Sequence, residues 1–182
     1  MLRAMYFPIR SRLQKEMFKG IYAGEIIYAL QDYEWEGVYC LATLKNARKK
    51  NNFIVCYVKQ HWIVFYFPPS HPNCVEIFDS CPQKISLYPD SIQMFVKDYS
   101  GVVQPSYSLQ SKNTYVCGFF CLLYIYYKHL HWPMEKIEYV LQTENIINSV
   151  LNKFNFPCCL VNHCITNDMC KKNKCCNNVM CE

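Results

Sequence analysis

The sequence predicts an α+β protein in which helices pack against one central β-sheet. Apolar residues make up 52% of the chain and charged residues 18%, so the chain can bury a core and is not expected to be disordered. Runs of β-branched and aromatic residues, separated by short turns, predict a β-meander in the middle of the chain. Helical patterns lie on both sides of that meander, and together they indicate a sheet covered by helices.

Two helices are expected before the strands. Residues 24–37, GEIIYALQDYEWEG, predict a helix that ends near Gly37. Residues 40–52, CLATLKNARKKNN, predict a second helix that is closed by its basic last turn and by Asn51-Asn52.

Three strands and a helix follow. The runs 53–58 (FIVCYV) and 61–69 (HWIVFYFPP) are separated only by Lys59-Gln60, which predicts a hairpin. Residues 74–80, CVEIFDS, predict a third strand that stops before Pro82. Residues 88–99 carry proline and aspartate at their start and apolar residues on one face, which predicts a helix.

The second half of the chain predicts one more strand and then helices. Residues 101–110 predict an edge strand, because Pro105 has no N–H to donate to a neighbouring strand. Residues 117–130, CGFFCLLYIYYKHL, are apolar all round, which predicts a buried central helix. Residues 133–154 are amphipathic with Pro133 near their start, and they predict one helix or two.

Composition divides the chain into a main domain, residues 1–156, and a Cys-rich C-terminal tail, residues 157–182. The longest apolar run, residues 119–127, is too short to span a bilayer, and the first residues contain no apolar stretch of signal-peptide length. We therefore expect a soluble intracellular protein that is neither secreted nor bound to membranes. The net charge of +5 is compatible with DNA contact but does not establish it.

Cys117 is the only one of thirteen cysteines that is followed by glycine. A cysteine at the start of a helix meets the positive end of the helix dipole, which lowers the thiol pKa and favours the nucleophilic thiolate. Gly118 would let a substrate backbone approach closely. The alternative is that Cys117 is a packing residue, as most cysteines beside an apolar helix are.

Three further residues complete a candidate catalytic set. His61 begins a strand beside Trp62 and could act as a general base, although it could also be a surface histidine at a hairpin. Asp79 ends the next strand, where it could orient His61 or simply cap the strand. Gln110 lies seven residues before Cys117, and its amide could help to form an oxyanion hole or could belong to an ordinary loop.

The order His-Trp, Asp, Gln-x6-Cys-Gly resembles the adenovirus endopeptidase (adenain) family and its relatives in adenovirus-like viruses and virus-derived elements. Four segments carry the resemblance: HWIVFYFPPSHPNCVEIFD, LQSKNTYVCGFFC, HLHWP and TENIINSVLNKF. More broadly, the chain is similar to the Ulp1-like proteases, which share this residue order. The resemblance covers residues 20–156 and implies a papain-like core with a central mixed sheet and a buried nucleophile helix.

The resemblance also implies a function. It assigns Cys117 as nucleophile, His61 as general base, Asp79 as the residue that orients His61, and Gln110 as an oxyanion donor. The implied reaction is peptide hydrolysis without a cofactor or metal, acting on viral precursor proteins during virion maturation. A monomer located in the virion and in the nucleus or cytoplasm of the host cell is expected, and cleavage after small residues, often glycine.

One departure limits the resemblance. Adenovirus enzymes are activated by DNA and by a short peptide that forms a disulfide with a cysteine in the strand before the glutamine. The corresponding segment here, KDYSGVVQPSYSLQ, contains no cysteine, so covalent activation of that kind is not implied. Activation by another peptide or by DNA stays open.

Two other functions are compatible with the sequence. A deconjugase would use the same four residues on a ubiquitin-like modifier, and a protease-derived binding protein would not use them catalytically. The filled catalytic positions argue against the second of these.

The tail, residues 157–182, contains seven cysteines and His163. They are enough for a zinc site, but no C-x2-C pair is present. We therefore expect a disordered or weakly ordered tail first, a zinc site second and disulfides third.

Overall fold

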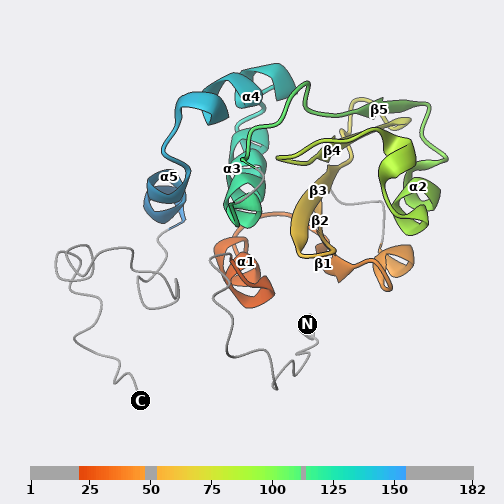
Figure 1. Ribbon diagram of the computed structural model, residues 1–182, viewed down its shortest axis with the longest axis horizontal. Coiled ribbons are helices and arrows are strands. Elements are labelled where there is room, and N and C mark those ends of the chain that lie inside the picture. The colour runs from red at the N-terminus through yellow and green to blue at the C-terminus, as the bar shows by residue number, and fades with distance from the viewer. Residues whose placement is uncertain (1–20, 48–52, 112–113, 155–182) are drawn as a thin grey trace, which may run out of the picture.

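A computed structural model describes residues 21–47, 53–111 and 114–154. It is an α+β structure with one five-stranded mixed sheet, in the order β1-β2-β3-β4-β5 (Figure 1). The strands are β1 (Gly37–Cys40), β2 (Phe53–Val58), β3 (His61–Tyr66), β4 (Cys74–Phe78) and β5 (Gly101–Val103). Across the described residues, no helix combines the length and the apolar character that crossing a membrane requires.

The centre of the sheet is the predicted meander. Strand β2 pairs with β3 and β3 with β4, both antiparallel, while the two edge strands run parallel to their neighbours. The β2–β3 hairpin turns through Lys59 and Gln60, which have φ values of 47° and 69°. Both are left-handed, as a tight two-residue hairpin turn requires. This turn places His61 at the first position of β3. Strand β5 lies at the sheet edge, as predicted, but it ends at Val103, so it is shorter than residues 101–110 and does not include Pro105.

The region before β2 differs from the prediction. Helix α1 (Ala23–Ala29) is shorter than residues 24–37, and the described part of the second predicted helix, residues 40–47, contains no α-helix. Gly37, expected to end a helix, instead begins β1, with a φ of 145° that side chains rarely adopt. Parallel pairing with β2 gives the backbone groups of residues 37–40 their hydrogen-bond partners. This long-range contact outweighs the helical preference of the neighbouring sequence. A short 3-10 helix, η1 (Leu44–Asn46), follows β1.

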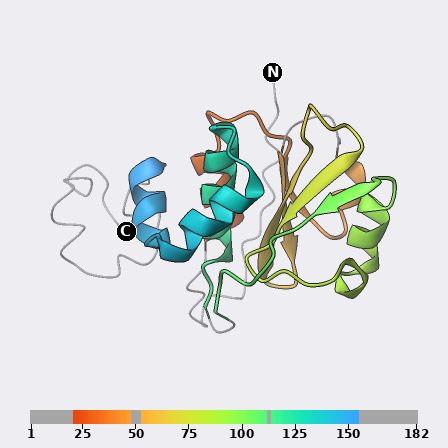
Figure 2. The ribbon, with the colours of Figure 1, turned by 90° about the horizontal axis from the view of Figure 1, so that it is seen from above.

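Helices cover both faces of the sheet (Figures 1 and 2). Because side chains alternate along each strand, the two faces have separate cores. One core lies between the sheet and helices α1, α3 (Cys117–His129), α4 (Met134–Thr143) and α5 (Ile146–Lys153). The other lies between the sheet and η1, η2 (Ile85–Leu87) and α2 (Asp90–Val96).

Helix α3 is the predicted buried helix. Eleven of its thirteen residues are buried, including Cys117 at its start. The amphipathic segment after it forms two helices, α4 and α5, because the chain breaks at Glu144 and Asn145. The Asn145 side chain accepts a hydrogen bond from the Asn148 amide at 3.2 Å and so caps the N-terminus of α5.

A buried ion pair fixes α3 against the sheet. Lys128 Nζ lies 2.7 Å from Glu76 Oε2 on β4, and both side chains are largely buried. The Tyr124 hydroxyl donates to the same carboxylate oxygen at 2.7 Å. The Tyr124 and Phe78 rings stack with centroids 4.4 Å apart. These contacts set the position of α3 on β4, and with it the position of Cys117.

We expect Lys128→Met to destabilise the fold by about 3–5 kcal/mol, the range for removing one partner of a buried ion pair. The substitution leaves the Glu76 carboxylate buried without its cation. Urea denaturation followed by circular dichroism measures the change. Lys97→Met is the matched control, because Lys97 is exposed at the end of α2. Equal stability of the two variants would contradict this assignment.

Candidate functional site

Cys117 occupies the first position of α3, a helix of 13 residues. Its side chain is 5% exposed and belongs to the core that α3 forms with the sheet. At this position the backbone N–H groups of the first turn have no partner within the helix and point beyond its N-terminus. A thiolate and a developing oxyanion are both stabilised there.

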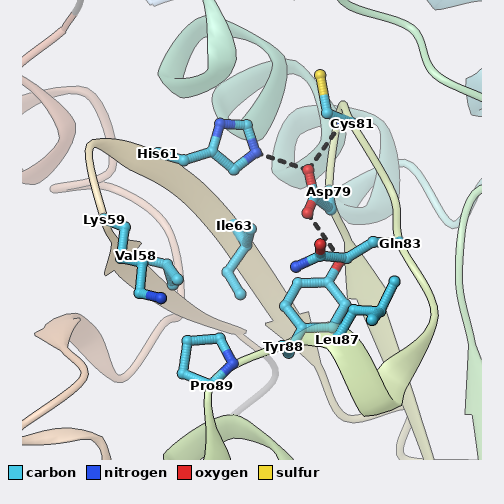
Figure 3. A pocket seen from close by; sticks show the side chains of 10 residues that line it. All are labelled: Val58, Lys59, His61, Ile63, Asp79, Cys81, Gln83, Leu87, Tyr88 and Pro89. Carbon is cyan, nitrogen blue, oxygen red and sulfur yellow. Dashed lines mark hydrogen bonds and ion pairs between the residues drawn. The ribbon is translucent and has the colours of Figure 1, made fainter.

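His61 lies at the start of β3 and is brought to Asp79 by the pairing of β3 with β4. Asp79 follows directly after β4, and its Oδ1 lies 2.6 Å from His61 Nε2 (Figure 3). Asp79 is 2% exposed, whereas the His61 side chain is 26% exposed. The imidazole therefore has a buried carboxylate on one side and access to solvent on the other. The sequence prediction that Asp79 lies beside His61 is confirmed as a contact.

Asp79 receives two further hydrogen bonds. The Cys81 amide donates to Oδ1 at 2.7 Å, and the Tyr88 hydroxyl donates to Oδ2 at 2.7 Å. Gln104 Nε2 lies 3.3 Å from the same hydroxyl. Burial, followed by the negative charge of Asp79, raises the pKa of Tyr88, so this hydroxyl stays a donor. The carboxylate is thus held by three donors in one orientation.

Asp79 and Cys117 both act on the His61 ring. Burial opposes protonation of the ring, but the hydrogen bond with Asp79 and then the influence of the Cys117 thiol outweigh it, and they raise the pKa of His61 to about 10. Since Nε2 faces Asp79, Nδ1 is the nitrogen left for the thiol side. A protonated imidazole between a carboxylate and a thiol stabilises the thiolate, which is the nucleophilic form.

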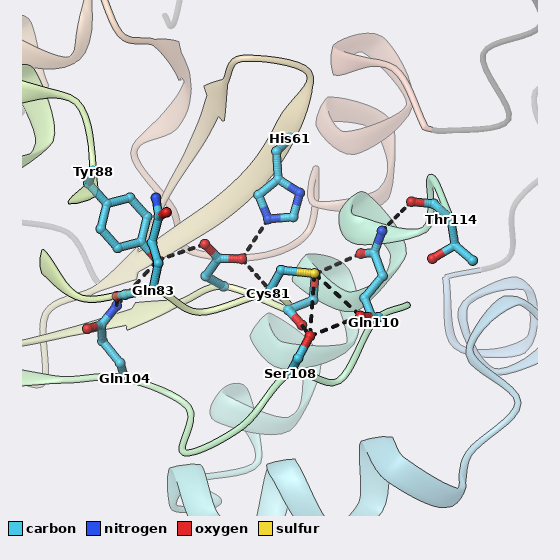
Figure 4. A network of polar contacts seen from close by, with 10 residues as sticks. His61, Cys81, Gln83, Tyr88, Gln104, Ser108, Gln110 and Thr114 are labelled. Carbon is cyan, nitrogen blue, oxygen red and sulfur yellow. Dashed lines mark hydrogen bonds and ion pairs between the residues drawn. The ribbon is translucent and has the colours of Figure 1, made fainter. Parts of the chain in front are cut away.

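Gln110 is buried and joined to the segment after β4. Its Oε1 accepts a hydrogen bond from Ser80 Oγ at 2.8 Å, and its Nε2 donates to the Thr114 carbonyl (Figure 4). The backbone amides of Leu109 and Gln110 donate to the Ser80 carbonyl at 2.8 and 3.0 Å. Asp79 and Gln110 are therefore anchored through adjacent residues, although 31 positions separate them in the chain.

The role expected of Gly118 is corrected. A Cβ atom at this position would collide with the Ile21 side chain and approach the Trp62 ring. The Trp62 indole N–H donates to the Ile21 carbonyl at 3.0 Å, which holds Ile21 in place. Glycine is thus required for packing of the N-terminal segment against α3, and this face of Gly118 is not open to a substrate.

Further cysteine and histidine side chains lie on or next to α3. Cys121 is 1% exposed, one helical turn after Cys117, and burial raises its pKa well above the usual value, so it is a packing cysteine. His129 and His131 lie at and just after the end of α3. Within residues 21–47, 53–111 and 114–154, no cluster of His, Cys, Asp and Glu could hold a metal. The boundary at residue 156 and the Cys-rich tail fall outside the described residues.

Sequence reasoning missed Ser80, Tyr88 and the Cys81 amide. Ser80 and Tyr88 are buried polar residues, and Asp-Ser-Cys-Pro after a strand is a turn signal. Nothing in the sequence relates Tyr88 to Asp79, because their contact depends on how the segment before α2 folds back.

Asp79→Asn is expected to lower the pKa of His61 from about 10, since the amide cannot supply the negative charge. The raised pKa of His61 stabilises the folded state: its contribution to the free energy of unfolding is complete below pH 6.5 and is lost as the pH rises towards 10. The Asp79→Asn variant should lose most of this pH dependence of stability. Titration of the histidine ring nitrogens by NMR measures the pKa, and His71→Ala identifies the signal of the loop histidine. An unchanged His61 pKa would contradict this account.

No protein-family model matches this chain, and a search of curated proteins finds no match either.

Proposed function

We propose that this chain is a cysteine endopeptidase in which Cys117 attacks the substrate and His61 transfers protons. The observation that carries the proposal is the position of His61. Its Nε2 lies 2.6 Å from the buried Asp79 carboxylate, and Cys117, at the N-terminus of α3, contributes with Asp79 to the raised pKa of its ring. A thiol, an imidazole and a carboxylate in this order form the relay that activates a nucleophile.

The proposed reaction has two stages. The Cys117 thiolate attacks the peptide carbonyl, and the protonated His61 gives its proton to the departing amine as the C–N bond breaks. This leaves a thioester on Cys117. A water molecule then loses a proton to His61 and attacks the thioester, which releases the carboxylic acid and restores the thiolate and imidazolium. Asp79 keeps the imidazole oriented throughout.

The hydrogen bonds of Gln110 support its role as an oxyanion donor. Because its Oε1 accepts from Ser80, the end of the amide that carries the N–H groups faces away from Ser80. One of these N–H groups is used by the Thr114 carbonyl, and the second is left to donate. Together with the Cys117 backbone amide, it would stabilise the negative oxygen of the tetrahedral intermediate.

We further propose a papain-like core of the adenain and Ulp1 type, with viral precursor proteins as substrates. The coarse architecture is compatible with this core: a mixed sheet carries histidine and aspartate, and the nucleophile begins a buried helix. The four residues also occur in the family's order, His61, Asp79, Gln110 and Cys117. Peptide or DNA activation and a location in virions belong to the same proposal.

The experiment that tests the activity combines alkylation with proteolysis. Wild-type protein is treated with iodoacetamide near neutral pH, and modified cysteines are mapped by mass spectrometry. At each time point, a proteome-derived peptide library is digested with the same sample. We expect proteolysis to be lost in step with modification of Cys117, and iodoacetamide-treated Cys117→Ser to gain no label at that position.

Cys40 provides the internal control. Cys40 is exposed. A hydrogen bond with the Thr43 side chain, followed by one with the Thr43 backbone, lowers the pKa of Cys40, so this thiol should also react quickly. Cys56 should react slowly, because burial raises its pKa to about 12. Loss of proteolysis that follows Cys40 instead of Cys117, or a chain that cleaves no peptide at all, would refute the proposed function.

A further inference from the structure

A cavity of about 300 Å³ opens beside the His61–Asp79 pair (Figure 3). Val58 and Lys59 from the β2–β3 hairpin lie on one side of it, and Leu87, Tyr88 and Pro89 from the segment before α2 lie on another. The proposed reaction uses His61 and Asp79 but gives no role to this space.

The lining residues relate the cavity to one half of a bound peptide. His61 lines it, whereas Cys117 and Gln110 do not. In the proposed reaction, the acyl half of the substrate is held at Cys117 and the oxyanion donors. The departing amine, in contrast, leaves past His61, which protonates it. Because His61 lines the cavity and Cys117 does not, we place the cavity on the leaving-group side.

Apolar side chains form most of the cavity. Val58, Ile63 and Tyr88 are buried and make its inner part. Leu87 also lines it and is 65% exposed, so its side chain is accessible to a group that enters the cavity. A cavity of this size and lining fits one aliphatic side chain, such as leucine or methionine.

The charges at the cavity favour an anion nearby. Three lining residues can carry charge, and two of them, His61 and Asp79, neutralise each other. The third is Lys59, which is exposed, and no carboxylate of the described residues pairs with it. Its left-handed backbone, with a φ of 47°, places it at the tip of the hairpin next to the cavity.

We propose that this cavity is the subsite for the residues that follow the scissile bond. It takes an apolar side chain, and Lys59 favours an acidic residue beside it. The inference rests on the proposed protease function and adds to it the class of leaving-group sequence that the site selects.

The test is a digest of a proteome-derived peptide library, in which the sequences on both sides of each cleaved bond are read by mass spectrometry. Wild-type protein should favour apolar and acidic residues after the bond. Leu87→Ala should reduce the preference for an apolar residue over glycine by about tenfold, the scale for a hydrophobic subsite contact. Lys59→Glu should shift the preference from acidic to basic residues. The profile before the bond should stay unchanged in both.

Lys84→Glu is the matched control, since Lys84 is exposed and does not line the cavity. It should keep the wild-type profile. If wild-type protein cleaves the library but Leu87→Ala and Lys59→Glu leave the profile after the bond intact, the subsite is refuted and the protease function stands. If the variants alter the residues before the bond instead, the cavity belongs to the acyl side and the inference is wrong. If the wild type cleaves nothing, the proposed function fails, and the inference fails with it.

Discussion

Cys117→Ala should abolish proteolysis while leaving the fold intact. Without the sulfur no thioester can form, and losses on the order of 10⁶-fold accompany removal of a nucleophile in a catalytic triad. The change removes one atom from a residue at a helix start, so α3 should still begin at this position. The measurement is cleavage of the peptide library, with circular dichroism as the check on folding.

Cys121→Ala is the matched control for this variant. It makes the same chemical change one turn further along α3, at a cysteine that is 1% exposed and has no role in the proposed reaction. It should retain proteolysis, even if the protein becomes less stable through the small void. Full activity in Cys117→Ala would show that the nucleophile is wrongly assigned, and loss of activity in both variants would indicate a folding defect.

The second large effect is expected for His61→Ala. Two functions are lost together, because the thiolate of Cys117 loses its cationic partner and the departing amine loses its proton donor. The loss should approach that of Cys117→Ala, on the order of 10⁶-fold. Alkylation of Cys117 near neutral pH should also slow, because the nucleophilic thiolate loses the imidazolium that stabilises it.

His71→Ala controls for the loss of a histidine. His71 is exposed in the loop between β3 and β4, where Ser70 Oγ lies 2.9 Å from its Nδ1. This variant should cleave peptides and react with iodoacetamide as the wild type does. The alkylation rate separates a catalytic from a structural effect of His61→Ala: an unchanged rate at Cys117 would mean that the two side chains do not interact.

Much of the architecture could be predicted from local patterns. The strands β2, β3 and β4 have apolar β-branched sequences bounded by turn residues, and the buried helix α3 is apolar on all sides. These signals come from the segments themselves, so they can be recognised without knowing which other elements the segments contact. The segment before β2 lacks such a signal. Strand β1 forms where the two predicted helices were to meet, and it depends on parallel pairing with β2, which no local pattern encodes.

Residue types and local patterns were enough to identify which side chains are available for chemistry and on which elements they lie. They placed His61 at a strand start, Asp79 at a strand end and Cys117 at a helix start. These positions follow from turn residues and hydrophobic runs that are contiguous in the chain.

The contacts that support those side chains follow from the three-dimensional packing of the elements. Tyr88 reaches Asp79, Ser80 reaches Gln110, and Lys128 reaches Glu76, over separations of 9, 30 and 52 residues. Ile21 covers Gly118 and gives that glycine a packing role in place of an open approach. The physical reason is that a hydrogen bond or a close packing contact depends on distances of a few tenths of an ångström. Such distances are set by the packing of whole elements, while residue type and spacing only limit which contacts are possible.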